Sequence, residues 1–201
     1  MLGGTEAGRR GPRRSSTSSL TPLLLLFVVV AVDVLRSSSD LTLLVDGLTD
    51  EVAHSSTAVL AVLALAGPRS AHEHRIFVAA AIVMSVAIDL DHLPWYLGLT
   101  TPGESGRPAS HSFATVIVLL AAGAVTRRAR PVLAGAATGA ALHLVRDVAT
   151  GPGAPLLWPF DASPLRLPYE AYLAVVVVLA IVATLRCRTY RRWAVDEQTL
   201  G

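Results

Sequence analysis

Ionisable residues stand at the end of an apolar run that is long enough to cross a membrane. The run covers residues 76–96, and its second half holds Asp89, Asp91 and His92. In a helix Asp89 and His92 share one face, because they are three residues apart, while Asp91 lies nearer the next face. Carboxylate oxygens and imidazole nitrogens are common metal ligands. The segment therefore predicts a metal site where the helix leaves the membrane.

An ordinary polar helix end is the alternative for this segment, since Trp95 and Tyr96 follow it and aromatic residues gather at membrane interfaces. Composition favours a membrane protein in either case, because 52% of the 201 residues are hydrophobic and the mean hydropathy is +0.53.

All 17 basic residues are arginines in short clusters. They do not cover a soluble face together with aromatic residues, so we expect no nucleic-acid binding.

The apolar runs predict an all-α, polytopic membrane protein with about six transmembrane helices in the lipid bilayer. The expected membrane domain covers residues 20–187, between a disordered tail at 1–19 and a polar cytoplasmic tail at 188–201. Thr49 or Asp50 is the expected N-cap of the second helix. The fifth helix is rich in glycine and alanine, which lets neighbouring helices approach closely. The predicted helices are 20–35, 50–66, 76–96, 111–125, 131–150 and 169–185.

The arginines fall unevenly on the two sides of these predicted spans. Cytoplasmic segments carry an excess of basic residues, so the richer side is expected to be cytoplasmic and to hold both termini. The poorer side holds four arginines, which are Arg36, Arg107, Arg146 and Arg166. The richer side holds the other thirteen, which are Arg9, Arg10, Arg13, Arg14, Arg69, Arg75, Arg127, Arg128, Arg130, Arg186, Arg188, Arg191 and Arg192.

On this topology the unusual acids and histidines all fall at extracytoplasmic helix ends. His72 and His74 lie in a loop on the other side, and we expect no site role for them. Acids and histidines in membrane helices are costly and usually face a partner or a water-filled cavity. Arginine count and ligand placement are independent features, so their agreement predicts one convergent site. Its candidate residues are Asp46, Asp50, Glu51, His54, Asp89, Asp91, His92, His111, His143 and Asp147.

Such a cluster suits one or two divalent ions, and imidazole favours zinc, manganese or iron over magnesium. The expected metal ligands are Asp89, His92, His111, His143, Asp147 and His54. The expected general base or supporting carboxylates are Asp91, Glu51 and Asp46. Arg107 and Arg146 suit an anionic group such as phosphate, and salt bridges to the nearby acids are the alternative for both arginines.

Four blocks of sequence carry a resemblance to a known family. They are Asp50-Glu-Val-Ala-His54, Asp89-Leu-Asp-His92, Arg107-Pro-Ala-Ser-His111-Ser, and His143-Leu-Val-Arg-Asp147 followed by Leu156-Leu-Trp-Pro-Phe160. In these blocks the chain resembles the YdjM-like family of membrane-bound, predicted metal-dependent hydrolases. The resemblance implies an inner-membrane protein with a metal site built from these blocks, and it names no substrate.

Three functions are compatible with this sequence. The first is a hydrolase in which metal-activated water attacks a phosphoester, or an ester, of a lipid or lipid-linked substrate at the outer face. The second is a metal-binding transporter, although the ligands lie at helix ends and no inverted repeat is evident. The third is a non-enzymatic scaffold, in which the cluster ties helix ends together by hydrogen bonds. A Gly-x-Ser-x-Gly motif or a glycine-rich phosphate loop, which would indicate other chemistry, is absent from the sequence.

Overall fold

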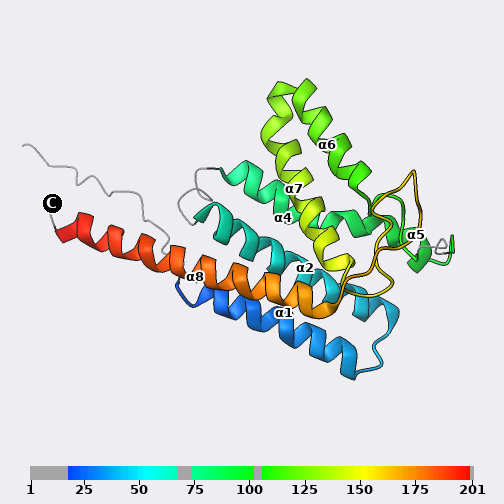
Figure 1. Cartoon of the computed structure of the whole chain (residues 1–201), viewed down its shortest axis with the longest axis horizontal. Helices are drawn as coiled ribbons and strands as arrows, with labels where there is room; N and C mark the ends of the chain where they lie inside the picture. The colour runs from blue at the N-terminus through cyan, green and yellow to red at the C-terminus, as the bar shows by residue number, and fades with distance from the viewer. Residues whose placement is uncertain (1–17, 68–73, 102–105, 200–201) are drawn as a thin grey trace, which may run out of the picture.

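The computed structural model describes residues 18–67, 74–101 and 106–199, and within these ranges the prediction of an all-α protein is confirmed (Figure 1). Most of the tail predicted at 1–19 lies outside the described residues, and so does His72. The longer helices are α1 (Thr21–Ser38), α2 (Leu43–Leu65), α4 (Arg75–Ala87), α6 (Phe113–Val125), α7 (Arg130–Asp147) and α8 (Tyr169–Thr199). The short ones are the 3-10 helices η1 (Ile88–His92) and η2 (Arg127–Ala129) and the α-helix α5 (Leu93–Tyr96).

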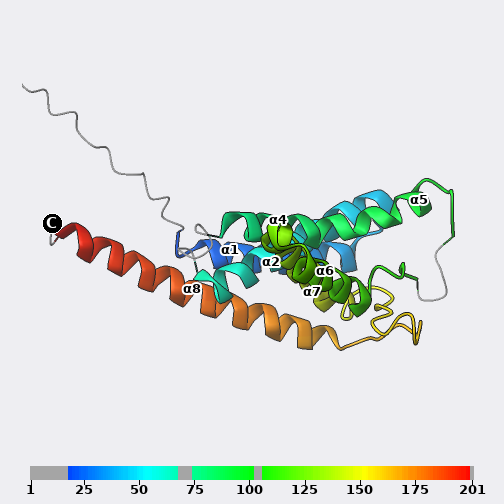
Figure 2. The ribbon, with the colours of Figure 1, turned by 90° about the horizontal axis from the view of Figure 1, so that it is seen from above.

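Helix α2 lies at the centre of the bundle. It contacts α1 and α8 on one side and α4 and α7 on the other, as Figures 1 and 2 show. Leu60 of α2 packs with Val29 of α1 and with Tyr172 and Val176 of α8 in an apolar core. Because α2 is surrounded by other helices, Asp50 and His54 in its first half are buried inside the protein.

Helices α4 and α7 approach each other at backbone distance. A Cβ atom added to Gly139 would lie 2.2 Å from the carbonyl oxygen of Ala81, and one added to Gly135 would lie 2.3 Å from that of Phe77. Only glycine fits at both positions, since the atoms in the way are backbone atoms. The expectation that the glycine-rich helix packs closely on a neighbour is confirmed, and this packing brings the end of α7 beside η1.

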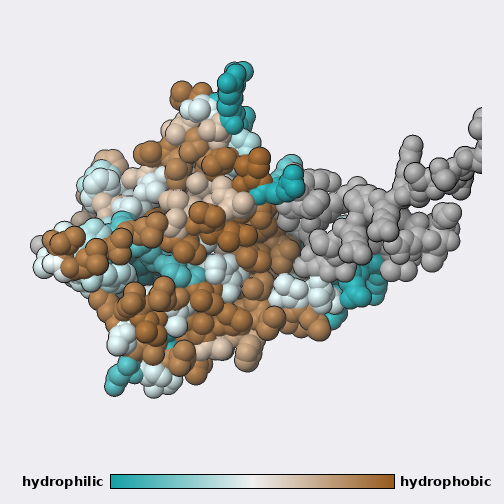
Figure 3. Space-filling model, turned by 180° about the vertical axis from the view of Figure 1, so that it is seen from behind, coloured by the Kyte–Doolittle hydropathy of each residue, from teal (hydrophilic) through white to brown (hydrophobic). Residues whose placement is uncertain are grey.

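The outer surface is largely apolar. Hydrophobic residues cover most of the face in Figure 3, and a hydrophilic hollow opens between them. Among the residues that the structure describes, four helices are long and apolar enough to cross a membrane: Thr21–Ser38, Leu43–Leu65, Arg75–Tyr96 and Tyr169–Arg192. Helix α6 is shorter, with 13 residues, and α7 carries Arg130, Arg146 and Asp147 near its ends. The structure thus supports four of the six predicted spans by these criteria.

Several predicted helix boundaries differ from those of the structure. The second helix begins at Leu43 after Thr42, not at Thr49 or Asp50, because the apolar run before Thr49 continues the same helix. The third helix ends at Tyr96, as predicted, but it tightens into η1, where Leu93 N–H donates to the carbonyl of Leu90; Pro94 has no N–H to continue the wider turn. The last helix continues to Thr199, since no glycine or proline interrupts the arginine-rich segment after Leu185.

Candidate metal centre

Four segments meet at the end of the bundle opposite the C-terminus of α8 (Figure 1). They are the first half of α2, the 3-10 helix η1, the loop that precedes α6, and the last two turns of α7. Their acids and histidines form two groups, and the ligand atoms within each group lie within 4.8 Å of one another. The first donor group is Asp89, Asp91, His92 and His111. The second donor group is His54, His143 and Asp147.

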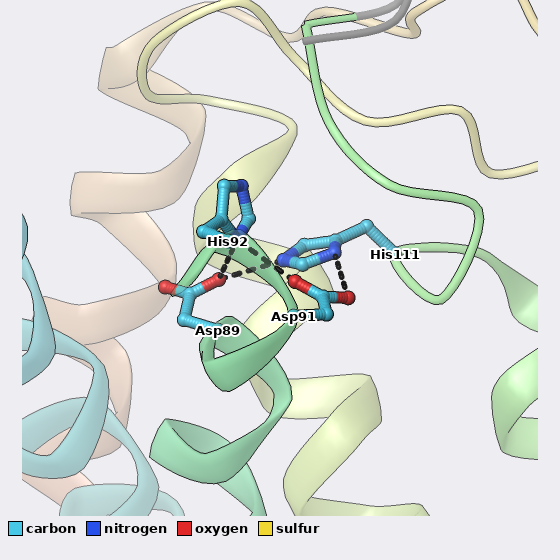
Figure 4. A group of neighbouring side chains, drawn as sticks. All are labelled: Asp89, Asp91, His92 and His111. Carbon is cyan, nitrogen blue, oxygen red and sulfur yellow. Dashed lines mark hydrogen bonds and ion pairs between the residues drawn. The ribbon is translucent and has the colours of Figure 1, made fainter. Parts of the chain in front are cut away.

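The first donor group is shown in Figure 4. Asp89 Oδ1 lies 2.7 Å from His111 Nε2 and 3.3 Å from His92 Nδ1. The tight turn of η1 keeps Asp89 and His92 on one face, as their spacing predicted. Asp91, expected nearer the next face, also belongs to the group, because its Oδ1 is 2.9 Å from His92 Nδ1. His111 is buried in the loop two residues before α6 begins, not in the helix as predicted.

The second donor group lies deeper, and its three residues are at most 1% exposed. His143 Nε2 is 3.1 Å from Asp147 Oδ2, one helical turn away on α7. His54 Nε2, on α2, is 3.4 Å from Asp147 Oδ1. The rings of His54 and His143 are stacked, with centroids 3.8 Å apart. Asp147 therefore presents each of its oxygens to a different histidine.

Two carboxylates connect the groups. Asp89 Oδ1 is 3.3 Å from His143 Nε2, and Asp147 Oδ2 is 3.6 Å from His111 Nε2. A tetrahedral zinc ion with bonds of about 2.0–2.1 Å has ligand atoms about 3.3 Å apart. The four printed separations among Asp89, His111, His143 and Asp147 range from 2.7 to 3.6 Å, so donors of the two groups lie at or near the spacing of metal ligands.

Buried atoms without hydrogen bonds support a metal site. They include His54 Nε2, His143 Nε2, both oxygens of Asp147, His92 Nδ1 and Asp91 Oδ1. A buried polar atom without a partner costs about 1–3 kcal/mol, and here these atoms converge on one place. A bound cation would satisfy them together. The donor set, with its four imidazoles and three carboxylates, fits zinc, manganese or iron.

Neighbouring groups orient these donors. His143 Nδ1 is 2.8 Å from the carbonyl oxygen of Ser85. A carbonyl only accepts, so Nδ1 carries the proton and Nε2 turns its lone pair toward the centre. The hydroxyl of Ser110 donates to Asp91 Oδ2. Arg107 Nη1 lies 3.1 Å from Asp147 Oδ2. Glu51, one turn before His54 on α2, interacts with Asp89 and is thus also at the centre.

A cavity of about 300 Å³ leads to the first donor group. Asp91, His92 and Arg107 form its polar wall. Thr100 and Thr101 add hydroxyls, and Trp95 with two prolines adds apolar surface. A small polar group can therefore reach the donors from outside the bundle, with an arginine beside them.

Arg146 lies elsewhere, in an ion-pair network that we call the outer network: Asp33, Arg36, Asp46, Asp50 and Arg146. Its guanidinium donates from Nε to Asp50 Oδ1 at 2.8 Å and from Nη2 to Asp33 Oδ1 at 2.6 Å. Nη1 donates to the hydroxyl of Tyr172 at 3.1 Å. Arg146 is fully buried, so the salt-bridge alternative describes its surroundings, and the structure does not bring it to the anion-accessible cavity.

Asp46 also belongs to the outer network, and the role expected for it at the metal site has no support in its position. Arg36 Nε lies 2.7 Å from Asp46 Oδ1, and Arg36 Nη1 donates to Asp50. A second cavity, of about 480 Å³, is lined by Asp33, Arg36 and Asp46 together with other polar residues and with apolar residues of α1 and α8. The link to the donors is Asp50, whose Oδ2 is 3.8 Å from His54 Nε2.

Several partners of these residues have no role among the predictions made from the sequence. Asp33 accepts from Arg146 and from Tyr169, whose hydroxyl is 2.7 Å from Asp33 Oδ2. Tyr172 contacts Arg146 and Thr57. One signal was available for Asp33, because an aspartate inside an apolar run usually faces a partner. The tyrosines carry no comparable signal, since aromatic residues are common at the ends of membrane helices.

A bundle of apolar helices that encloses converging imidazoles and carboxylates defines a class: polytopic membrane proteins with a candidate metal centre. Within this class, the chain belongs to the YdjM inner membrane protein family, whose model matches residues 50–199. The matched region contains both donor groups and the cavity. No curated protein and no solved structure is significantly similar to the chain.

Proposed function

We propose that the protein is a metal-dependent hydrolase of the inner membrane, which cleaves a phosphoester, or an ester, of a lipid or lipid-linked substrate. The observation that carries this proposal is the convergence of buried donor atoms without hydrogen bonds beside a cavity that ends at Asp91, His92 and Arg107. A scaffold needs no cavity at its polar network. A transporter needs a path through the membrane, whereas this cavity opens at the helix ends.

The chain's own residues supply the roles of a hydrolase. Asp89, His92, His111, His143, Asp147 and His54 would hold the metal. When bound, a divalent ion lowers the pKa of water and polarises a phosphoryl or carbonyl oxygen. Asp91, within the first donor group, and Glu51, beside Asp89, are the carboxylates placed to take up a proton. Arg107 suits a phosphate group, because its planar guanidinium donates two parallel hydrogen bonds to phosphate oxygens.

The surroundings of the cavity favour a substrate from the membrane. Gly151 packs against the Arg107 side chain, and the loop that follows exposes Leu157, Trp158 and Phe160. Phe160 is 96% exposed, as expected for a residue that inserts into the bilayer interface. A cavity of about 300 Å³ has room for a headgroup and not for a whole lipid, so the acyl chains would stay in the membrane.

We further propose that both termini are cytoplasmic, that six helices cross the membrane and that the site faces the extracytoplasmic side. The arginine distribution supports this orientation, with thirteen on the proposed cytoplasmic side and four on the other. A substrate of the outer leaflet, or a lipid-linked precursor presented there, would then reach the cavity directly.

The experiment is a comparison of the parent protein with an Asp89→Ala, His143→Ala double variant, both purified in mild detergent. Elemental mass spectrometry should find zinc, manganese or iron in the parent and not in the variant. The parent, and not the variant, should release phosphate or alcohol from a panel of phospholipids and lipid phosphates. His74→Ala and Asp161→Asn are matched controls, because both residues are exposed and lie outside the donor groups.

The outcomes separate the three functions. Metal with hydrolysis supports the proposal. Metal without hydrolysis, but with metal uptake into proteoliposomes, would indicate a transporter. If the folded parent contains no metal and cannot take any up, the proposed metal site is refuted. The cluster would then act as a hydrogen-bonded scaffold.

A further inference from the structure

We infer that the centre holds two metal ions, one in each donor group, bridged by Asp89 and Asp147. This inference deepens the proposed function and rests on it for the identity of the site, but not on any particular substrate.

The number of donors favours two ions. The two groups supply seven residues, whereas a zinc ion takes four ligands and an octahedral ion six. One ion cannot use them all.

The buried polar atoms that lack a hydrogen bond lie in both donor groups. Asp91 Oδ1 and His92 Nδ1 lie in the first donor group, and His54 Nε2 and Asp147 Oδ1 lie in the second; all are buried without a hydrogen bond. Asp91 Oδ1 faces His92 Nδ1 at 2.9 Å and Asp147 Oδ1 faces His54 Nε2 at 3.4 Å, so an ion in one group would leave the pair of the other group facing only each other. Two ions satisfy both sets, and the usual pairing of buried polar atoms therefore favours two.

The carboxylates of Asp147 and Asp89 each face histidines of both donor groups. Asp147 directs Oδ1 toward His54 and Oδ2 toward His143 and His111. Asp89 Oδ1 faces His111 and His92 in its own group and His143 in the other. Carboxylates that face two sets of ligands are what a two-ion centre requires, where the ions lie about 3.5–4 Å apart.

The two positions differ in their access to solvent. The cavity of about 300 Å³ is lined by Asp91 and His92 of the first donor group and by no residue of the second. Every residue of the second group is at most 1% exposed. The ion of the first group should therefore exchange readily and meet the substrate, while the ion of the second group should exchange slowly.

The inference also narrows the substrate class. Two ions at this spacing bind both the attacking and the leaving oxygen of an in-line displacement, as in phosphatases and nucleases. Arg107 borders the same cavity and contacts Asp147. We therefore favour a phosphate ester over a carboxylic ester as the group that enters the cavity.

The test is loading of the metal-free full-length protein with Mn²⁺, followed by metal analysis and electron paramagnetic resonance. We expect two ions per chain and the spectrum of a spin-coupled pair. An Asp91→Ala, His92→Ala variant should lose the exposed ion, and a His54→Ala variant the buried one; each should keep one ion with the spectrum of isolated Mn²⁺. Chelator added to the parent should remove one ion in a fast phase and the other in a slow phase. His74→Ala is the matched control.

A single ion per chain in the parent, or two ions without spin coupling, would overturn the inference. If that protein still hydrolyses a lipid phosphate, the proposed function stands and only the second ion is wrong. A parent that binds no Mn²⁺ and no Zn²⁺ overturns both. His54→Gln and His92→Gln, which keep side-chain volume, replace any alanine variant that loses its helical circular dichroism. If these also unfold, the parent's stoichiometry and spectrum decide.

Discussion

Replacement of Arg146 by methionine should destabilise the protein without a direct effect on the metal donors. Methionine keeps an unbranched side chain of similar length and removes the charge. Arg146 makes hydrogen bonds to Asp33, Asp50 and Tyr172 from all three guanidinium nitrogens. The substitution therefore leaves two carboxylates inside the bundle without the cation that faces them.

The expected magnitude follows from what remains. Removing one partner of a buried ion pair costs about 3–5 kcal/mol. Asp50 would keep its bond from Arg36, and Asp33 its bond from the Tyr169 hydroxyl. We therefore expect the lower end, a loss of about 3 kcal/mol, which lowers the ratio of folded to unfolded protein about 150-fold. For a chain of this size the midpoint of thermal unfolding should fall by about 6–12 °C.

The assay is thermal unfolding in detergent, followed by circular dichroism, with Arg188→Met as the matched control because Arg188 is exposed on α8. An additional Asp33→Asn change should restore part of the loss, because it removes one of the unpaired charges. Equal midpoints of thermal unfolding for Arg146→Met and Arg188→Met would show that the ion pairs of Arg146 do not stabilise the protein. A further drop in the midpoint when Asp33→Asn is added to Arg146→Met would also contradict the prediction.

Three more predictions concern packing, pH and orientation. Gly139→Ala should sharply reduce the yield of folded protein, because its Cβ would meet the Ala81 carbonyl. The control Gly123→Ala should fold, because its Cβ would meet only the Leu133 side chain, at 3.3 Å. Equal yields by size-exclusion chromatography would contradict this prediction. Acidification from about pH 7.5 to about pH 5.5 should release the metal, because histidines bind as neutral imidazoles; metal content that is constant over this range would argue against histidine ligands. Orientation can be tested with single cysteines in a Cys187→Ala background. Thr100→Cys should react with a membrane-impermeant maleimide on intact spheroplasts, and His74→Cys should react only after lysis. The reverse pattern would place the site at the cytoplasmic face.

Much of the candidate site could be predicted because its members stand close together in the sequence. Asp89 and His92 are three residues apart, and His143 and Asp147 are four apart, so a helix of either kind brings each pair to one face. The cost of such residues in an apolar segment marks them as exceptional. Arginine counts add the expected side of the membrane. These signals are local and need no knowledge of the packing.

The two arginines show where local signals end. Arg107 and Arg146 both lie near acids at predicted helix ends, and their sequences alone gave them the same anion-binding role. The structure places Arg107 at the cavity and buries Arg146 among Asp33 and Asp50, which are 113 and 96 residues away. Asp46, predicted as a supporting carboxylate of the metal site, pairs with Arg36.

Composition and the periodicity within single helices were enough to predict the helical class, four of the apolar spans and the residue types that can hold a metal. Only the tertiary structure decided which donors share a group, which carboxylates connect the groups and which arginine stays accessible. Those features depend on the approach of α4 to α7 and on the central position of α2, and contacts between distant segments are fixed by packing that no local pattern encodes.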